Sequence, residues 1–406
     1  MANAHDITAT PIARAAVVSR RPRLSAFVCH DVTGAGRLWQ QLEANPAATF
    51  HQSRAWVEAW VGGTGTTLSI VTLELEGQPL AILPLEIVHR RGLKVARFAG
   101  TAFSNANTGL LPESLTGARA DIAPGELAAA LSRAGLDADI VLFDKMPPDA
   151  ASQSPFSELP RVFHQNPSFQ LPLLTDFNAV LAQINGKRRR KKFRVSQRRL
   201  EALGGYRHII GEDDEQALRL LEVFLKQKPV RLAAQGLPNV FADPGVRAFM
   251  ARLAMTRDQR GRPALELHGI ELTGGDNKGE IIAVAGLTIK DRHVTCQFGS
   301  INDEIAPDAS VGELLFYHMI ERASVAGEQV FDFGVGDQLY KRSWCPVRTD
   351  LVDCHVPLTV KGRLAAPAIT GMIRLKRKIK TSPMLHRFAA WLRGLVVRRQ
   401  SAPVDI

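Results

Sequence analysis

The chain has 406 residues, of which 45% are hydrophobic and 22% are charged, the composition of an ordinary globular protein. This length predicts about two domains and excludes a small disulfide-stapled fold. The net charge of +11 is uneven: residues 187–199 carry nine basic residues and residues 361–400 carry eleven, with no acidic residue in either segment. The other 31 basic residues face 40 acidic ones, so we expect a mildly acidic body with two basic patches.

The four cysteines, Cys29, Cys296, Cys345 and Cys354, form no Cys-x-x-Cys pair and have no histidine at zinc-finger spacing. We therefore expect free thiols in a reducing compartment and no metal site. No window has the run of about 18 apolar residues that a membrane span needs, and residues 1–23 lack the apolar core of a signal peptide. These features indicate a cytoplasmic protein with a disordered N-terminal segment, residues 1–23.

Apolar periodicity in the first half alternates between helical and strand-like segments. Ser53 is a plausible N-cap in the first helical region. Helices are expected over 50–60 and 123–134, and strands over 67–75, 79–88, 93–99 and 139–144. The segment 146–172 holds six of the 23 prolines and is predicted to be a linker.

The second half repeats this plan. Asp243 and Pro244 have the residue types of an N-cap and a first helical position. We expect helices over 176–202, 212–229, 243–257 and 311–326, and strands over 264–272, 280–290, 292–300 and 329–333. The spacing of Gly77, Ala81 and Leu85 recurs in Gly279, Ala283 and Leu287, which suggests a duplicated domain.

The segment 330–344 (Val-Phe-Asp-Phe-Gly-Val-Gly-Asp-Gln-Leu-Tyr-Lys-Arg-Ser-Trp) is the strongest candidate for a site. A short strand runs into a glycine turn, and a phenol and two cations follow within about one helical turn. Tyr340 could protonate a leaving group, Lys341 and Arg342 could neutralise phosphates, and Asp332 could act as an acid or base. The alternative is an ordinary strand, turn and solvated helix start.

The segment Ser310-Val311-Gly312-Glu313 has the Ser-x-x-Glu spacing of a capping box. A helix start offers free N–H groups and a positive dipole end, and Gly312 leaves room for a ligand. Ser310, Val311 and Gly312 are therefore a candidate cradle for a pyrophosphate. The alternative is a capping box that only begins a helix.

Both basic segments could bind anions. The run 187–194 (Lys-Arg-Arg-Arg-Lys-Lys-Phe-Arg) lies in a helical pattern, so it is either a solvated helix face or a site for the phosphates of RNA, a cofactor or lipid. The segment 361–400 mixes cations with Leu, Ile, Met, Phe and Trp, as do amphipathic helices on anionic membranes. Disorder, or docking on the acidic body, is the alternative for this segment.

Together, the strand ending Phe-Asp-Phe-Gly, the following Gly-Asp-x-x-Tyr-Lys-Arg-x-Trp and the earlier helix start Ser-x-Gly resemble the GNAT-type acyltransferase domain of CelD/BcsL-like proteins of cellulose biosynthesis. The segments Phe-His-Gln-Ser-Arg-Ala-Trp and Lys-Arg-Arg-Arg-Lys-Lys-Phe fit that family too, and the likeness covers residues 25–358. These proteins are similar to the Fem-type transferases, which have two GNAT-like domains in tandem.

The resemblance implies an α/β fold with two tandem GNAT-like domains, each a mixed, largely antiparallel sheet flanked by helices. The expected limits are a disordered segment, an N-terminal GNAT-like domain, a linker, a C-terminal acyltransferase domain and a basic amphipathic tail, over residues 1–23, 24–145, 146–172, 173–358 and 359–406.

The resemblance also implies an acyl-CoA-dependent N- or O-acyltransferase of polysaccharide or envelope assembly, which uses acetyl-CoA and no metal. Ser310, Val311 and Gly312 would hold the pyrophosphate, and Tyr340 would protonate the CoA thiolate. Only Gly312 survives of the common Gln/Arg-x-x-Gly-x-Gly/Ala loop. No general base stands out, and Asp332 is the nearest candidate.

Two other functions stay open. One is a Fem-like transferase that takes its donor from tRNA bound at residues 187–194. The other is an inactive GNAT pair that binds a membrane synthase through residues 361–400. The basic tail also allows a peripheral position at the inner membrane. The sequence does not identify the acceptor, which could be a sugar or an amine.

Overall fold

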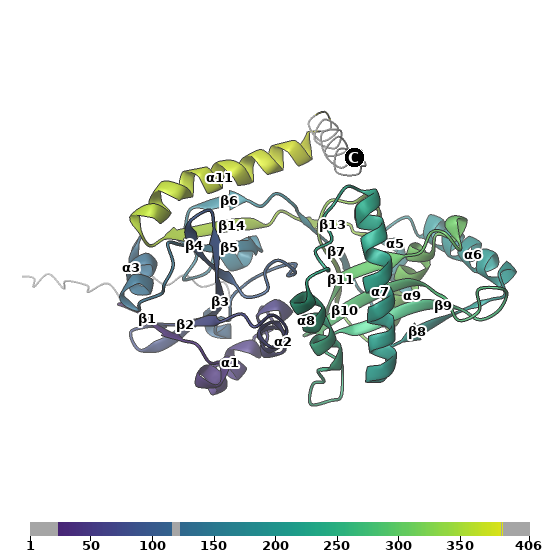
Figure 1. The fold of residues 1–406 in the computed structure, drawn as a ribbon, viewed down its shortest axis with the longest axis horizontal. Coiled ribbons are helices and arrows are strands. Elements are labelled where there is room, and N and C mark those ends of the chain that lie inside the picture. The colour runs from purple at the N-terminus through teal and green to yellow at the C-terminus, as the bar shows by residue number, and fades with distance from the viewer. Residues whose placement is uncertain (1–22, 116–121, 383, 385–406) are drawn as a thin grey trace, which may run out of the picture.

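The computed structural model describes residues 23–115, 122–382 and 384 of the chain. It contains two seven-stranded mixed sheets, each flanked by helices (Figure 1). The expected mixed α/β class is confirmed. Almost all of the segment predicted to be disordered, and most of the tail beyond residue 382, lie outside the described residues.

The first sheet has the strand order β1-β2-β3-β4-β5-β14-β6, in which only β4 and β5 are parallel. Ser53 caps helix α2 by accepting a hydrogen bond from the Trp56 N–H at 3.2 Å, as the sequence predicts. The strands are β1 (Leu24–Cys29), β2 (Leu68–Leu75), β3 (Gln78–Arg90), β4 (Leu93–Phe98), β5 (Ile140–Met146), β6 (Arg161–Phe163) and β14 (Val352–Pro357), and the helices are α1 (Gly36–Glu43), α2 (Arg54–Thr64), α3 (Glu126–Arg133) and α4 (Pro148–Ala151).

The second sheet has the order β13-β7-β12-β11-β10-β9-β8, and only β11 and β12 are parallel. The strands are β7 (Ser168–Pro172), β8 (Tyr206–Ile210), β9 (Glu266–Leu272), β10 (Ile281–Lys290), β11 (His293–Ile301), β12 (Val330–Val335) and β13 (Val347–Thr349). The helices are α5 (Phe177–Ala182), α6 (Gly186–Ala202), α7 (Asp214–Ala234), α8 (Pro244–Met255), α9 (Val311–Val325) and α10 (Leu339–Trp344).

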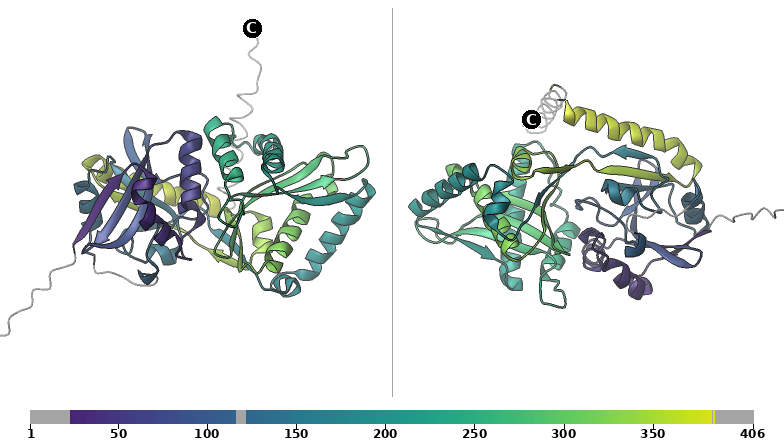
Figure 2. Two further views of the ribbon diagram at one scale, coloured as in Figure 1. Left: turned by 90° about the horizontal axis from the view of Figure 1, so that it is seen from below. Right: turned by 180° about the vertical axis from the view of Figure 1, so that it is seen from behind.

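Two helix predictions in this half have different outcomes. Asp243 caps α8 by accepting from the Val246 N–H, with Pro244 at the first position, as predicted. The single helix expected over 176–202 is two helices, because Asn185 interrupts the pattern and its side chain caps α6. Helices α7 and α8 cover one face of the second sheet, and α6 and α9 cover the other (Figure 2).

Each sheet is completed by a strand that the sequence places elsewhere. Strand β7 lies in the segment predicted to be a linker, yet it pairs with β12 and β13 of the second sheet. Strand β14 lies inside the expected C-terminal domain, yet it pairs with β5 and β6 of the first sheet. The first sheet therefore takes β14 from the second half of the chain, and a boundary drawn along the sequence does not separate the two sheets. Local sequence patterns identify a strand but not the sheet that it joins.

Both parallel strand pairs are short. Strands β4 and β5 pair over Val95 to Arg97, and β11 and β12 pair over His293 to Thr295. Beyond these residues the paired strands separate, so each sheet opens at the carboxyl ends of its central strands. Ligands of α/β folds usually bind at this kind of place.

Helix α11 (Val360–Thr381) lies along β5, β6 and β14 of the first sheet (Figure 1). Gly362 allows the close approach, because a Cβ there would overlap the Asp139 carbonyl. Ala366 and Ile369 pack with Val95 and Ile140. Among the described helices, none combines the length and the apolar content needed to pass through a lipid bilayer.

Candidate functional site

The separation of β11 and β12 opens a cavity of about 520 Å³ in the second half, a size typical of small-molecule sites. Its walls come from β10, β11, β12, α7, α9 and α10. Four of the predicted site residues line it: Ser310, Gly312, Tyr340 and Lys341. A larger groove, of about 760 Å³, lies on the first half and contains no predicted site residue.

Strand β11 carries a bulge where it borders the cavity. The pairing with β10 is regular up to Cys296 and resumes at Phe298, so Gln297 is an extra residue. A bulge redirects side chains and frees backbone groups from the ladder, and bulges are common beside active sites. The Gln297 side chain lines the cavity and donates to Thr288 Oγ1 at 2.6 Å, which fixes its orientation.

Helix α9 begins at the cavity, but not with the expected capping box. Ser310 is left-handed, with φ of +48°, and its side chain makes no capping hydrogen bond. Such strain in a residue other than glycine is characteristic of ligand sites. The backbone N–H groups of Val311 and Gly312 lie in the first turn, where the helix supplies no acceptor and the dipole favours an anion. The Val311 side chain is buried, so only its backbone could contact a ligand.

Glu313 lines the cavity beside this helix start and is held by cations. Arg189, which is only 3% exposed, binds the Glu313 carboxylate and also donates to the backbone oxygen of Ser343 at 2.6 Å. Trp344 Nε1 donates to Glu313 at 3.1 Å, and Lys192 Nζ lies 3.4 Å from it. The negative charge of Glu313 is therefore compensated, and the helix start stays compatible with an anionic ligand.

Tyr340 contributes a hydroxyl to the cavity. Its ring stacks on Phe316 at a centroid distance of 5.4 Å and meets Phe333 edge-on at 6.0 Å. Among the described residues, no hydrogen-bond partner of this hydroxyl is found. Burial raises its pKa above the ordinary value, and the nearby Cys296 thiol adds to the effect. The phenol is therefore protonated at neutral pH and can donate a hydrogen bond to charge that develops beside it.

The cavity lining is rich in positive charge. Lys341 is buried, and its Nζ donates to the carbonyls of Gly334 at 3.1 Å and Val335 at 2.8 Å. Burial lowers the pKa of Lys341 to about 8. Lys228 and Arg231 of α7 add two more cations. This balance favours an anionic ligand.

Besides Val311, two residues predicted for the site lie outside the cavity lining. Arg342 is exposed and forms an ion pair with Asp337, with Arg342 Nη2 2.7 Å from Asp337 Oδ2, so its assignment to phosphate binding is not supported by its position. Asp332 is 4% exposed and accepts hydrogen bonds from Ser168 and Gln170.

The environment of Asp332 argues against the role of general base. Burial alone would raise its pKa, but hydrogen bonds from His293, Gln170 and the Gly334 N–H lower it below the ordinary value. A carboxylate that is stabilised in its charged form and does not reach the cavity is a poor proton acceptor. The sequence interpretation is corrected here: Asp332 anchors the start of β12 to β7.

The first half supplies one residue that the sequence analysis missed. Asn105 lines the cavity, accepts from the Val335 N–H at 3.0 Å and donates to Gln297 Oε1 at 2.9 Å. Its own N–H donates to His51 Nε2 at 3.3 Å. Gly334 has φ of +71°, and a Cβ there would overlap the Asn105 amide. The absence of a side chain at Gly334 therefore leaves room for Asn105 of the first half. No local sequence pattern predicts this contact.

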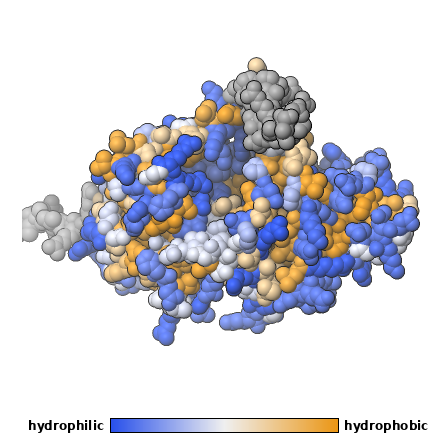
Figure 3. All heavy atoms as spheres, in the orientation of Figure 1, coloured by the Kyte–Doolittle hydropathy of each residue, from blue (hydrophilic) through white to orange (hydrophobic). Residues whose placement is uncertain are grey.

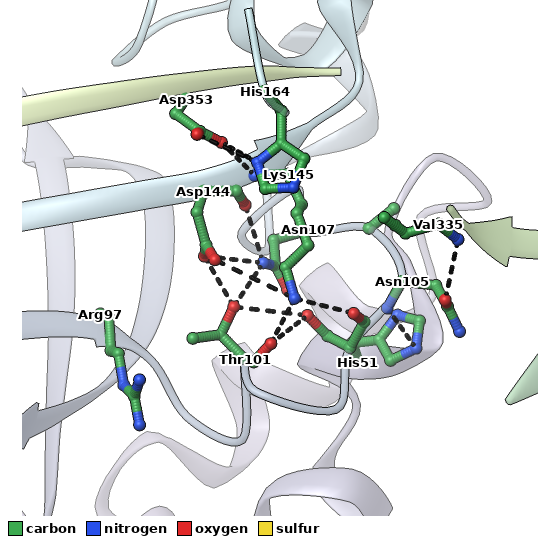
Figure 4. Close-up of polar contacts among 12 residues, drawn as sticks. His51, Arg97, Thr101, Asn105, Asn107, Asp144, Lys145, His164, Val335 and Asp353 are labelled. Carbon is green, nitrogen blue, oxygen red and sulfur yellow. Dashed lines mark hydrogen bonds and ion pairs between the residues drawn. The ribbon is translucent and has the colours of Figure 1, made fainter. Parts of the chain in front are cut away.

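The corresponding opening in the first half is filled by its own chain (Figure 4). Asn107, which is fully buried, donates to the Asp144 carbonyl at 2.8 Å and to Thr101 Oγ1 at 3.1 Å. Lys145 Nζ donates to the Ser104 carbonyl at 2.8 Å. Burial lowers the pKa of Lys145. The loop after β4 is thus bonded to the end of β5 across the gap where the second half has its cavity.

Comparison with known proteins agrees with this geometry. Residues 187–342 match the family described as an acetyltransferase (GNAT) domain, so the second half carries such a domain and the expected acyltransferase is confirmed. No curated protein matches the sequence. The chain is similar to the crystal structure of FemX, with 13% identity, a TM-score of 0.57, and 84% of this chain and 99% of that chain covered. This likeness shows the fold. The two seven-stranded sheets confirm the expected tandem arrangement.

Two further solved structures are more distant. The C-terminal DUF2156 domain of an Agrobacterium fabrum protein has 13% identity and a TM-score of 0.49, with 82% of this chain and 97% of that chain covered. A tandem GNAT protein from the clavulanic acid biosynthesis pathway has 12% identity and a TM-score of 0.42, with 83% and 99% covered.

Proposed function

We propose that the chain transfers an acyl group from an acyl-CoA, in the first instance acetyl-CoA, to a nitrogen or oxygen of an acceptor. The observation that carries the proposal is the cavity between β11 and β12. It lies beside the free first turn of α9, contains an unpartnered Tyr340 hydroxyl and is lined by cations. These features match a donor that combines a diphosphate with a thioester.

In this proposal each wall has a separate task. The N–H groups of Val311 and Gly312 bind the diphosphate, and the backbone of β11 aligns the pantetheine arm toward the bulge at Gln297. The acceptor nitrogen or oxygen bonds to the thioester carbon as the C–S bond breaks, and Tyr340 donates a hydrogen bond and then its proton to the departing sulfur. The proton that the acceptor loses to water restores the phenol. Lys341 lines the same cavity as Tyr340. Its positive charge stabilises the thiolate before the sulfur is protonated.

Calorimetric titration of the full chain with acetyl-CoA tests this proposal. We expect one molecule bound per chain, because only the opening of the second half is free in the described structure. Free CoA should compete for the same site. Absence of any heat or thermal stabilisation from acetyl-CoA, longer acyl-CoAs and CoA at millimolar concentration would reject the proposal.

The acceptor and pathway rest on the sequence resemblance alone. We propose an acceptor with a sugar hydroxyl or amino group in cellulose, polysaccharide or envelope assembly, as the CelD/BcsL-like motifs suggest. A screen of amino sugars, oligosaccharides and small amines, in which release of the CoA thiol is measured, tests this assignment. Transfer to simple amines without transfer to any carbohydrate would contradict it.

We also propose that the cytoplasmic protein rests on the inner membrane through α11. Its outward side exposes Leu364 (76%), Met372 (42%) and Leu375 (57%), and Lys361, Arg363 and Arg374 are exposed on the same helix. Apolar and hydrophilic side chains lie next to each other along this edge (Figure 3). Apolar side chains flanked by cations favour an anionic lipid surface.

Vesicle sedimentation tests the membrane contact. The wild type should sediment with vesicles that contain phosphatidylglycerol and less with pure phosphatidylcholine. The triple variant Leu364→Ser, Met372→Ser and Leu375→Ser should sediment less. It should keep its fold, because these three side chains are exposed. Equal sedimentation of the wild type and the triple variant would remove α11 as the contact.

A tRNA-dependent transfer is the second candidate, because α6 exposes a set of cations that no described carboxylate pairs: Lys187, Arg188, Arg190, Lys191, Arg194, Arg198 and Arg199. Such a surface would bind RNA with steep salt dependence. Micromolar binding of tRNA at physiological salt, together with no binding of acyl-CoA, would favour this function over the first.

A further inference from the structure

The cations of α6 are not one uniform surface. The inner face of the helix buries Arg189, Ser196 and Leu200 against the domain. The remaining cations have different neighbours according to their position around the helix. This difference allows one group to be assigned a role.

One row faces the start of α9. Lys192 Nζ lies 3.4 Å from the Glu313 carboxylate, which lines the cavity. Arg199 donates to the backbone oxygen of Asp308, two residues before Ser310. Arg188 stands four residues before Lys192, and Arg199 stands seven after it, so the three share one side of the helix.

The other cations point elsewhere. Arg190 contacts Asn178 of α5, and Arg194 donates to the Arg190 carbonyl, on the flank away from the cavity. Lys187, Lys191 and Arg198 are exposed and fall opposite the buried face by helical spacing. Lys187, Lys191 and Arg198 carry the same total charge as the row that faces α9, but they lie on a different side of the helix.

The row at α9 has more positive charge than its protein neighbours require. Buried Arg189 already compensates Glu313, so the charge of Lys192 is in excess there. Among the described residues, Arg188 and Arg199 form no ion pair. Three cations beside a helix start, with one carboxylate that is already neutralised, create a positive potential that favours an anion from outside the protein.

We propose that Arg188, Lys192 and Arg199 bind the 3′-phosphate of the acyl-CoA donor, which deepens the proposed function and rests on it. Lys192 and Arg199 contact the segment 308–313, which includes the helix start proposed to bind the diphosphate, and all three cations lie outside the cavity lining itself. A phosphate monoester carries a charge of about −1.5 to −2 near neutral pH. Arginine and lysine side chains are the usual partners of such a group. Helix α6 therefore recognises the nucleotide end of the donor, while the cavity recognises the thioester end.

The test compares CoA with 3′-dephospho-CoA, which lacks only that phosphate, by calorimetry on the full chain at constant ionic strength. The wild type should bind CoA about tenfold more tightly, the effect of one charge-assisted contact. In a variant with R188Q, K192Q and R199Q the two ligands should bind equally, and the affinity for 3′-dephospho-CoA should stay within twofold of the wild type. The matched control with K187Q, K191Q and R198Q should keep the tenfold preference.

Three results would overturn the inference. Equal affinity of the wild type for both ligands would remove the phosphate contact. Equal loss in both triple variants would show a general electrostatic effect, as expected of an RNA-binding face. Binding of neither ligand would reject the proposed function itself and this subsite with it. The single variant R188Q keeps the test valid if the triple variant is unstable, because the Arg188 side chain has no hydrogen bond or ion pair to a described residue. It should reduce the preference about threefold.

Discussion

The two halves of the molecule share one sheet plan and use its central opening in opposite ways. In both, a short parallel pair separates at the carboxyl ends of its strands. The first half fills the gap with its own loop, through Asn107 and Lys145. The second half leaves a cavity of about 520 Å³. The same backbone topology therefore does not predict a ligand site, because the loop that follows the fourth strand decides whether a ligand has room.

Each half also buries a lysine whose ammonium group lies near the end of the fifth strand of this plan, although Lys145 belongs to β5 itself and Lys341 to α10. Lys145 donates across the gap to carbonyls of the loop, including Ser104 at 2.8 Å. Lys341 donates to Gly334 and Val335, at the end of a single strand. The first lysine closes its opening, whereas the second places a positive charge at its edge and leaves it free. The comparison indicates that the first half is a scaffold. It contributes Asn105 to the cavity of the second half.

Removal of Asn107 should have the largest effect on this contrast. Asn107→Ala deletes hydrogen bonds to Asp144 and Thr101 and leaves the Gln52 amide, which donates to Asn107 at 2.9 Å, without its partner. At about 1 kcal/mol for each buried hydrogen bond, we expect a loss of about 3 kcal/mol of unfolding free energy. Urea denaturation followed by tryptophan fluorescence measures it.

The control for this prediction is Asn178→Ala at an exposed position of α5. It should change the unfolding free energy by less than about 0.5 kcal/mol. If Asn107→Ala is equally harmless, the loop does not fill the first opening in solution, and the contrast between the halves fails.

In the second half, Tyr340→Phe should lower turnover about 100-fold, within the range of general acid catalysis, and leave the affinity for acetyl-CoA within twofold. The phenylalanine keeps the stack on Phe316 and removes only the hydroxyl. Steady-state rates and calorimetry separate the two effects. Tyr317→Phe is the matched control, since Tyr317 stacks on Phe193, away from the cavity lining. Unchanged turnover in Tyr340→Phe would remove this hydroxyl from the mechanism.

The sequence predicted most elements of both halves because their signals are local. Alternating apolar residues predicted the central strands, and Asp243 with Pro244 predicted the start of α8. The recurring spacing of Gly77 to Leu85 and Gly279 to Leu287 falls on β3 and β10, which occupy equivalent places in the two sheets. Periodicity and capping depend only on neighbours in sequence, so these features were within reach.

The errors concern contacts between distant segments. The sheets that β7 and β14 join depend on which strand edges are available in the fold, and sequence patterns do not encode this. The spacing from Ser310 to Glu313 predicted a capping box, but Glu313 binds Arg189 instead, a residue of the basic run. Asp332 was expected as a base, although its partners come from β7 and β11. For acid–base roles, residue type gave the candidates, and only the fold showed which of them reach the cavity.

Filling the second opening should make it resemble the first. Gly312 lines the cavity, and its nearest neighbour for an added Cβ is the flexible Ile301 side chain at 3.3 Å. Gly312→Leu should therefore preserve the fold and lower the affinity for acetyl-CoA about 30-fold, or about 2 kcal/mol. Titration calorimetry measures the loss. The control is Gly371→Leu, at a helix position with open space around it, which should bind acetyl-CoA as the wild type does. If Gly312→Leu also binds acetyl-CoA normally, the donor does not bind in this cavity.

The smallest expected effect is the pH dependence that the titration of Lys341 gives to the unfolding free energy. Burial lowers its pKa to about 8 in the folded protein, against 10.5 for an ordinary lysine. Between these values the unfolded chain binds the proton more strongly than the folded one, so the contribution of Lys341 to the unfolding free energy rises with pH. The wild type should gain about 1 kcal/mol relative to Lys341→Met between pH 8 and pH 9. Urea denaturation at each pH measures the difference.

The control for the titration is Lys361→Met, at an exposed position of α11, which should differ from the wild type by a constant amount over the same pH range. A flat difference for Lys341→Met as well would show that the lysine keeps its charge and an ordinary pKa in the folded protein. Lys341 would then face water at the edge of the cavity. Lys341 and Lys145 would then differ in their access to solvent. Lys228 or Arg231, and not Lys341, would be the candidate for the buried charge that favours the thiolate.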